Sequence, residues 1–294
     1  MFINAIEKVD GFTRPIHTIT RTYGGLISPG ASTLFFVNEE GVAITCKHVI
    51  ALVIQGQLIN DNYIKFKSER DKLPKDNKFR RNKGLLENKY KYKKETIVQL
   101  KNNFINSVAP FTGLTYHIHP TLDLAIIIFN GFTQKHYNSY ATFVKDSAKI
   151  QQGKYLCRLG YPFPEFNNFQ YNQTIDDIET NTGNPASPRF PIDGIITRHI
   201  GDSNQHITGI EMSTPGLRGQ SGGPLFDTDG LVYCMQFATN HLHLGFDMKD
   251  HEIVSNGKKS KVSNYPFLHV GQCIHVEIIK EFLTLHKIKF YVEK

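Results

Sequence analysis

Cysteine is scarce in this sequence, and its residues are far apart. The four are Cys46, Cys157, Cys234 and Cys273. No two of them form a Cys-x-x-Cys pair, so a zinc or redox motif of that kind is excluded. We expect all four to be free, buried thiols, and we expect no disulfide to contribute to stability.

Long apolar runs are missing as well. The longest covers residues 124–129, whereas a helix that spans a bilayer needs ~20 apolar residues. The first twenty residues contain Glu7, Lys8 and Asp10 and lack the apolar stretch of a secretory signal. The sequence also has no low-complexity tract and no repeat of fixed period. It therefore predicts a cytoplasmic protein with no membrane partner.

What is present is the composition of an ordinary globular protein. Of 294 residues, 40% are hydrophobic and 21% are charged, which is enough apolar material for a sizeable core. The length suits one large β-unit or two smaller ones that share a cleft.

The net charge of +7 comes from one segment. Residues 65–101 carry fourteen Lys and Arg against five Asp and Glu, and the rest of the chain is slightly acidic. We interpret residues 63–107 as a basic insertion, with a helix over 84–106 that carries Tyr90 and Tyr92. The insertion is either a solvated excursion or a site for an acidic protein partner or activator. Nucleic acid is disfavoured because no recognised motif for it is present.

Short β-rich runs dominate the remainder. Residues 32–37 and 42–45 flank a polar turn and predict a hairpin. Apolar positions over 276–283 recur at helical spacing and predict a helix docked on a core. Many short strands at irregular spacing favour a barrel or sandwich over a parallel sheet. The further predicted strands are 114–118, 124–129, 154–158, 194–198, 206–212 and 231–236.

The strongest chemical signal is the string Gly219-Gln-Ser-Gly-Gly-Pro224. A serine hydroxyl is a good nucleophile only if a base takes its proton and donors receive the oxyanion. Small residues around Ser221 let the backbone turn so that the N–H groups of Gly219 and Ser221 face one point. The alternative is a glycine-rich turn without chemistry.

Two further residues complete a candidate triad. His48 follows a predicted strand and Asp123 precedes one. Alone, the first is typical of a loop histidine and the second of a turn former. Together with Ser221 they occur in the order His, Asp, Ser, each at the edge of a β-run, which favours nucleophilic catalysis.

These motifs resemble the trypsin/chymotrypsin superfamily of serine peptidases, and most closely its bacterial Deg/HtrA-like trypsin-like peptidase domain. The matching strings are Thr45-Cys-Lys-His48, Asp123-Leu-Ala and Gly219-Gln-Ser-Gly-Gly-Pro224, with a weaker echo in Leu159-Gly-Tyr-Pro162. The resemblance covers residues 30–283 apart from the insertion.

The resemblance implies an all-β fold of two six-stranded antiparallel β-barrels with a C-terminal helix. The first, residues 1–135, would carry His48 and Asp123, and the second, residues 136–294, would carry Ser221. The active site would lie between them, with Gly219 and Ser221 forming the oxyanion hole.

Two departures from the superfamily bear on regulation. Gln220 stands where zymogens have an aspartate that pairs with a freed N-terminus, and no Ile-Val-Gly-Gly start is present. Activation by N-terminal cleavage is therefore not expected, and control by loop ordering or by a partner is. The chain also ends soon after its last predicted helix, which leaves no room for a PDZ domain.

The specificity pocket follows from the same alignment. Pro215, six residues before Ser221, occupies the place of the aspartate in trypsin-like enzymes. We therefore expect an uncharged, small or medium apolar P1 side chain, with Arg218 at the rim. The backbone of residues 237–239 should bind substrate as an added strand. The predicted substrate-binding residues are Pro215, Arg218, Gln236, Phe237, Ala238 and Thr239.

No metal or cofactor is predicted. The pairs His117/His119 and His241/His243 each alternate along a strand, but neither has a Cys or carboxylate at a ligand spacing. The predicted function is a regulated bacterial serine endopeptidase that acts on proteins or peptides. The alternative is a catalytically silent binding protein that uses the protease fold and the basic insertion.

Overall fold

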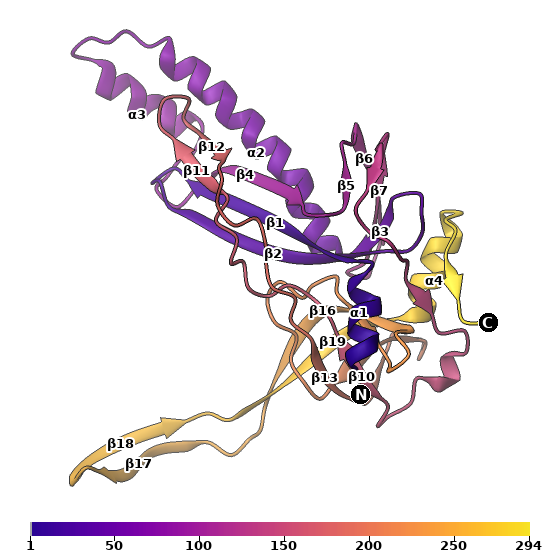
Figure 1. Ribbon diagram of the computed structural model, residues 1–294. Helices are drawn as coiled ribbons and strands as arrows, with labels where there is room; N and C mark the ends of the chain where they lie inside the picture. Colours follow the sequence, from indigo (N-terminus) through magenta and orange to yellow (C-terminus); the bar gives the residue numbers. More distant parts are fainter. Residues whose placement is uncertain (1) are drawn as a thin grey trace.

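Two β-units follow one another along the chain (Figure 1). The computed structural model describes residues 2–294. None of the helices in this range is long and apolar enough to cross a membrane.

The first unit is a six-stranded antiparallel sheet in the order β4-β1-β2-β3-β7-β6. The predicted hairpin is confirmed, because β2 pairs with β3 through Phe35 and Ile44. Within the described chain β4 and β6 do not pair with each other, so the sheet is curled but open. Its strands are β1 Thr13–Thr22, β2 Ile27–Phe36, β3 Val42–Thr45, β4 Ile97–Phe104, β6 Gly113–Ile118 and β7 Ala125–Asn130.

The second unit closes on itself. Strand β15 (Pro224–Phe226) pairs with both β10 (Tyr155–Arg158) and β16 (Val232–His243), which joins six strands in a ring. Two short parallel strands continue from β16. The predicted all-β fold of two six-stranded antiparallel barrels with a C-terminal helix is thus confirmed, except that the first barrel is an open, curled sheet. The remaining strands are β13 Ile192–Gly201, β14 Ile207–Met212, β19 Phe267–His275, β9 Thr142–Phe143 and β20 Tyr291–Val292.

Helices and small hairpins decorate these units. Figure 1 shows a helical hairpin, α2–α3, projecting beside the first sheet, and a β17–β18 arm projecting from the second unit. The helices are α1 Ile3–Asp10, α2 Lys47–Asp71, α3 Phe79–Lys89, α4 Val276–Leu285 and the short 3-10 turn Ser147–Lys149. The small strands are β5 Val108–Ala109, β8 Gln134–Lys135, β11 Phe169–Asn172, β12 Asp177–Thr180, β17 Met248–Ser255 and β18 Lys258–Asn264.

The predicted helix over 84–106 is wrong from residue 90 onward. Helix α3 ends at Lys89, and β4 is an edge strand that pairs with β1. Val98 and Leu100 of β4 are buried, and Asn60 of α2 exchanges hydrogen bonds with the backbone of Leu100. Pairing with a distant strand and burial under α2 therefore overrule the local helical pattern.

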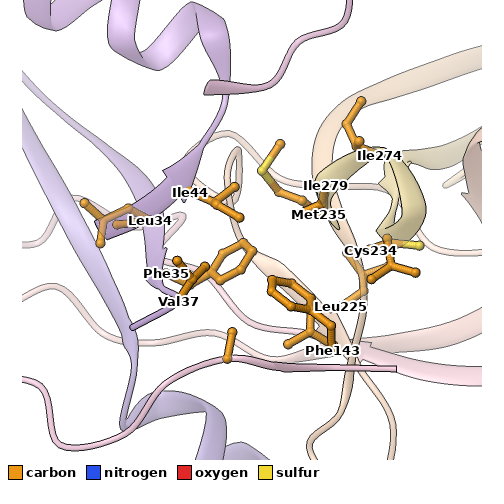
Figure 2. Packing of buried hydrophobic residues seen from close by; sticks show 14 of the residues in the cluster. Leu34, Phe35, Val37, Ile44, Phe143, Leu225, Cys234, Met235, Ile274 and Ile279 are labelled. Atoms are coloured by element: carbon orange, nitrogen blue, oxygen red, sulfur yellow. The ribbon is translucent and has the colours of Figure 1, made fainter. Parts of the chain in front are cut away.

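One hydrophobic core joins the two units. Figure 2 shows Leu34, Phe35 and Ile44 of the first sheet converging on Phe143 and Met235 of the second unit. The rings of Phe35 and Phe143 lie 6.4 Å apart in an edge-to-face arrangement, which is favourable for aromatic pairs. All four cysteines are buried and free, as predicted.

Both chain ends cross to the opposite unit. Phe2, just before α1, packs on Tyr155 and Phe226 of the second unit at 5.4 and 6.1 Å between ring centroids. At the other end, His286 after α4 stacks on His117 of β6 at 3.9 Å. The two units are therefore clasped from both termini.

A buried ion cluster ties the long loop between β10 and β13 to the first sheet. Asp176, in the tight turn between β11 and β12, pairs with Arg21 of β1 at 2.6 Å and with Arg70 of α2 at 2.8 Å. The hydroxyls of Tyr63 and Tyr171 donate to the same carboxylate. One side chain thus holds a strand, a helix and a loop together.

We expect Asp176→Asn to lower the free energy of unfolding by about 3 kcal/mol at neutral pH, because two largely buried guanidinium groups lose their counter-charge. Burial alone would raise the pKa of the Asp176 carboxyl, but hydrogen bonds from Tyr171, Arg70 and Tyr63 outweigh it and hold the pKa below its usual value. This stabilisation is therefore present at neutral pH and is lost as the pH falls through the folded-state pKa.

Urea denaturation of wild type and variant across pH tests this expectation. Asp71→Asn is the matched control, because Asp71 also pairs with Arg70 but its side chain is 65% exposed, and it should cost less than about 1 kcal/mol. Equal losses in the two variants, or an unchanged acid dependence in Asp176→Asn, contradict the role given to Asp176.

Candidate active site

His48 and Asp123 meet because their strands are neighbours. His48 lies in the first turn of α2 directly after β3, and Asp123 lies just before β7, which pairs with β3 through Thr45 and Ala125. His48 Nδ1 and Asp123 Oδ2 are 2.6 Å apart. The other carboxylate oxygen accepts the backbone N–H of His48 at 2.9 Å. This contact orients the ring with Nδ1 as donor, which leaves Nε2 to accept a proton.

The Asp123 carboxylate stays ionised in this setting. Burial alone would raise its pKa, but the hydrogen bonds from the side chain and backbone of His48 hold the pKa below its usual value. Asp123 is therefore suited to orient the imidazole and to stabilise its charged form.

Ser221 lies in the loop between β14 and β15, at the contact between the two units. Its carbonyl accepts the N–H of Thr33 from β2 at 3.0 Å. The next residue, Gly222, donates to Gln236 O at 2.9 Å, and Cys46 Sγ, two residues before His48, donates to the same oxygen at 3.3 Å. Cys46, near His48, and Gly222, next to Ser221, thus share one acceptor. No hydrogen bond joins Ser221 Oγ to His48 Nε2 in residues 2–294.

Glycine is required at 219 for steric reasons. Gly219 has a φ of +96°, and a Cβ there would overlap Tyr161 O and come within 2.7 Å of Pro162 Cα. The Gly219 carbonyl accepts a hydrogen bond from the Thr33 hydroxyl at 2.7 Å. The peptide group between Gly219 and Gln220 therefore cannot flip without breaking this bond.

The loop leaves two N–H groups for a ligand. Within the described residues, the backbone N–H groups of Gly219 and Ser221 have no acceptor. Gln220 between them is buried; its Nε2 donates to Phe190 O at 2.9 Å and its Oε1 accepts from Leu217 N at 3.0 Å. A neutral amide thereby fixes the loop through two hydrogen bonds and without a charged pair.

A cavity of about 570 Å³ adjoins Ser221. All six predicted substrate-binding residues line it, and none of its lining residues carries a carboxylate. The sequence analysis missed four other lining residues. His269 could not be predicted from the sequence, because only the pairing of β19 with β16 brings it to the cavity. The additional lining residues are Gly216, Leu217, His241 and His269.

Cys46 lies near enough to His48 and Asp123 that one atom of each falls within 4.8 Å of the others. The thiol is fully buried, which raises its pKa well above the usual value, and its S–H is donated to Gln236 O. A protonated thiol is a poor metal ligand, and Asp123 is already engaged with His48. The donor set therefore fits a triad better than a metal site.

An imidazole held by a carboxylate, a serine in a glycine-rich loop with two free N–H groups and an adjoining cavity together define a serine hydrolase of the chymotrypsin-like kind. The chain belongs to the trypsin-like peptidase domain family, whose sequence model matches residues 32–235. It is a trypsin-like serine endopeptidase by this membership.

Solved structures with a related architecture include several proteases. The HtrA-type protease AlgW with a decapeptide is 13% identical and has a TM-score of 0.49, over 97% of this chain and 68% of that one. AlgW with a tripeptide is 14% identical with a TM-score of 0.47, and the 96% of this chain that aligns spans only 62% of it. The active form of the Rv3671c protease from M. tuberculosis is 11% identical with a TM-score of 0.47, over 98% of this chain and 86% of that one. Likeness at this level carries nothing about function. No curated protein sequence matches the chain.

We expect Gly219→Ala to slow active-site reactivity about 100-fold or more, because a Cβ would push the N–H of residue 219 away from the position of the oxyanion. Gly245→Ala is a matched control, since Gly245 also has a positive φ but no atom lies within 4 Å of its would-be Cβ. The rate of labelling by a fluorophosphonate measures the effect without a known substrate. Equal rates in the two variants, with equal melting temperatures, contradict the role of Gly219.

Proposed function

We propose that this protein is a serine endopeptidase in which Ser221 is the nucleophile, His48 the general base and Asp123 the residue that orients His48. The observation that carries the proposal is the bidentate contact of Asp123 with His48, close in sequence to Cys46, which shares the Gln236 carbonyl with Gly222 of the Ser221 loop. The intact set of three residues favours an enzyme over a silent scaffold.

The proposed reaction is acyl transfer in two steps. His48 Nε2 takes the Ser221 hydroxyl proton as the oxygen attacks the peptide carbonyl, and the N–H groups of Gly219 and Ser221 stabilise the oxyanion. His48 then gives the proton to the leaving amine. A water molecule, deprotonated by His48, releases the carboxylic acid product and restores the serine.

The substrate chain would add to the edge of residues 237–239. Strand β16 bulges at Phe237, where its pairing with β19 shifts, so Phe237 is left out of the ladder. Backbone groups freed in this way support antiparallel pairing with an extended peptide.

The P1 residue would not be Lys or Arg. Pro215 lines the cavity, and no lining residue carries a negative charge that could pair with a basic side chain. An uncharged P1 side chain, as expected from the sequence, stays a prediction.

The cellular location and the regulation of this protease are inferred from its sequence. We propose a regulated protease of the bacterial cytoplasm that binds an acidic protein through the basic segment. This segment begins within the helix that carries His48, and the α2–α3 hairpin projects from the body (Figure 1). Exposed apolar residues on it, such as Leu58 and Leu85, favour a binding role and support the alternative of a non-catalytic binding protein.

Ser221→Ala decides between the enzyme and the silent scaffold. We expect wild type to react with a fluorophosphonate and to cleave protein substrates, and the variant to lose both by at least about 10⁴-fold, because no other group can form the acyl-enzyme. Ser203→Ala, in the exposed turn between β13 and β14, should behave as wild type.

The readout for cleavage is the set of new protein termini after incubation with a host lysate. Termini that appear with Ser203→Ala but not with Ser221→Ala support the proposal. Absence of labelling and of new termini in wild type leaves the scaffold as the better account.

A further inference from the structure

A buried arginine lies behind the wall of the cavity. Arg158, at the end of β10, is fully buried. Its Nη2 donates to Pro215 O at 2.7 Å and to Thr214 O at 3.4 Å, and its Nη1 donates to Gln236 Oε1. Its Nε is buried and has no partner.

No carboxylate neutralises this cation. Among residues 2–294 the other buried arginine, Arg21, pairs with Asp176, whereas Arg158 forms no ion pair with a carboxylate. Buried charges are normally paired, because taking an unpaired cation out of water is unfavourable. The site therefore has a positive charge in excess.

A single layer of residues separates the Arg158 guanidinium from the cavity. Pro215 and Gln236, both hydrogen-bonded to Arg158, line the cavity beside Ser221. The Gln236 amide lies directly under Gly216, another lining residue, since a Cβ on Gly216 would overlap the Gln236 amide. A ligand in the cavity is thus separated from the guanidinium by the Gln236 side chain.

Gln236 is oriented by this contact. Its Oε1 accepts from Arg158 and from Cys273 Sγ at 3.4 Å, so the amide cannot be reversed without placing N–H against N–H. Its Nε2 donates one N–H to Ala238 O at 2.5 Å, and its second N–H remains for a ligand. The cation polarises the amide and makes this second N–H a stronger donor.

The rest of the cavity lining contains no acidic side chain. Arg218, His241 and His269 are part of this lining. The two histidines are cross-strand partners on β16 and β19, with their Nδ1 atoms 2.6 Å apart. At this distance one Nδ1–H donates to the other Nδ1, and the fixed positive charge in the lining itself is that of Arg218.

We propose that this cavity selects an acidic P1 residue, glutamate, whose carboxylate accepts from Gln236 and is compensated by Arg158 behind it. This inference rests on the proposed function, and at P1 it replaces the uncharged side chain that the sequence predicts with an acidic one. Arg158 acts as a positioning and charge-compensating residue, while Gln236 touches the substrate. A basic P1 side chain is repelled by the positive charge. An apolar one leaves the second Gln236 N–H without an acceptor and the Arg158 guanidinium without a counter-charge.

The test is a series of peptides that differ only at P1, with Glu, Gln, Leu or Arg. We expect kcat/KM for Glu to exceed that for Gln about tenfold or more, because Gln has the same shape and lacks only the charge. The peptide with Arg at P1 should not be cleaved. The Glu/Gln ratio should persist at high salt, since a buried charge is screened little.

Variants separate Arg158 from the surface charge. In Arg158→Met the Glu/Gln ratio should fall to about 1, and Arg158→Lys should restore part of it. Arg218→Gln should keep most of the ratio, because Arg218 is exposed. A ratio that falls with Arg218→Gln and not with Arg158→Met overturns the role of Arg158.

The wild-type series is decisive if the buried variants do not fold. Cleavage after Leu or Gln in preference to Glu overturns the inference and leaves the proposed function intact. If no peptide is cleaved and Ser221 is not labelled by a fluorophosphonate, the proposed function fails, and the inference fails with it.

Discussion

The contact between Thr33 and the Ser221 loop is the constraint on which the site depends. Thr33 of the first sheet donates its N–H to Ser221 O and its hydroxyl to Gly219 O. Gly222, packed against Thr33 O and Thr45, leaves no room for a side chain. The loop that contains Ser221 can therefore pack in only one position, directly against the sheet that carries His48 and Asp123. The position of Ser221 relative to His48 and Asp123, the three residues of the proposed triad, follows from this contact.

The segment from 159 to 191 links this contact to the outer parts of the molecule. It starts against Gly219, and its far end supplies the Phe190 carbonyl that holds Gln220. Between these points Asp176 docks on Arg70, in the last turn of the helix whose first turn carries His48. The helix that carries His48 and the loop that carries Ser221 thus contact the same stretch of chain. Gln220 fixes the loop without a charged partner, through its hydrogen bonds to Phe190 O and Leu217 N.

Much of the fold and site was predictable because it depends on local patterns. The hairpin 32–45, the strand after Asp123 and the helix after His275 are short runs whose burial is encoded in their own residues. The Gly219–Pro224 string needs only its neighbours to form a tight loop. Helix α2 was missed because apolar residues such as Leu58 stay exposed and blur its amphipathic pattern. Strand β4 was missed because its partner β1 lies some eighty positions earlier.

By itself, the sequence determined the class of protein, since a serine in a glycine-rich string, a histidine after one strand and an aspartate before another are typical of trypsin-like peptidases. The tertiary structure alone decided the electrostatics of the pocket. Arg158 belongs to an unremarkable strand, and nothing near it in sequence marks it as a neighbour of Gln236 or Pro215. Ring closure of the second unit brings β10, β15 and β16 together and seals the guanidinium behind the cavity. Charge in a protein interior acts through distance in space and through the solvent excluded around it, and both exist only once the chain is folded.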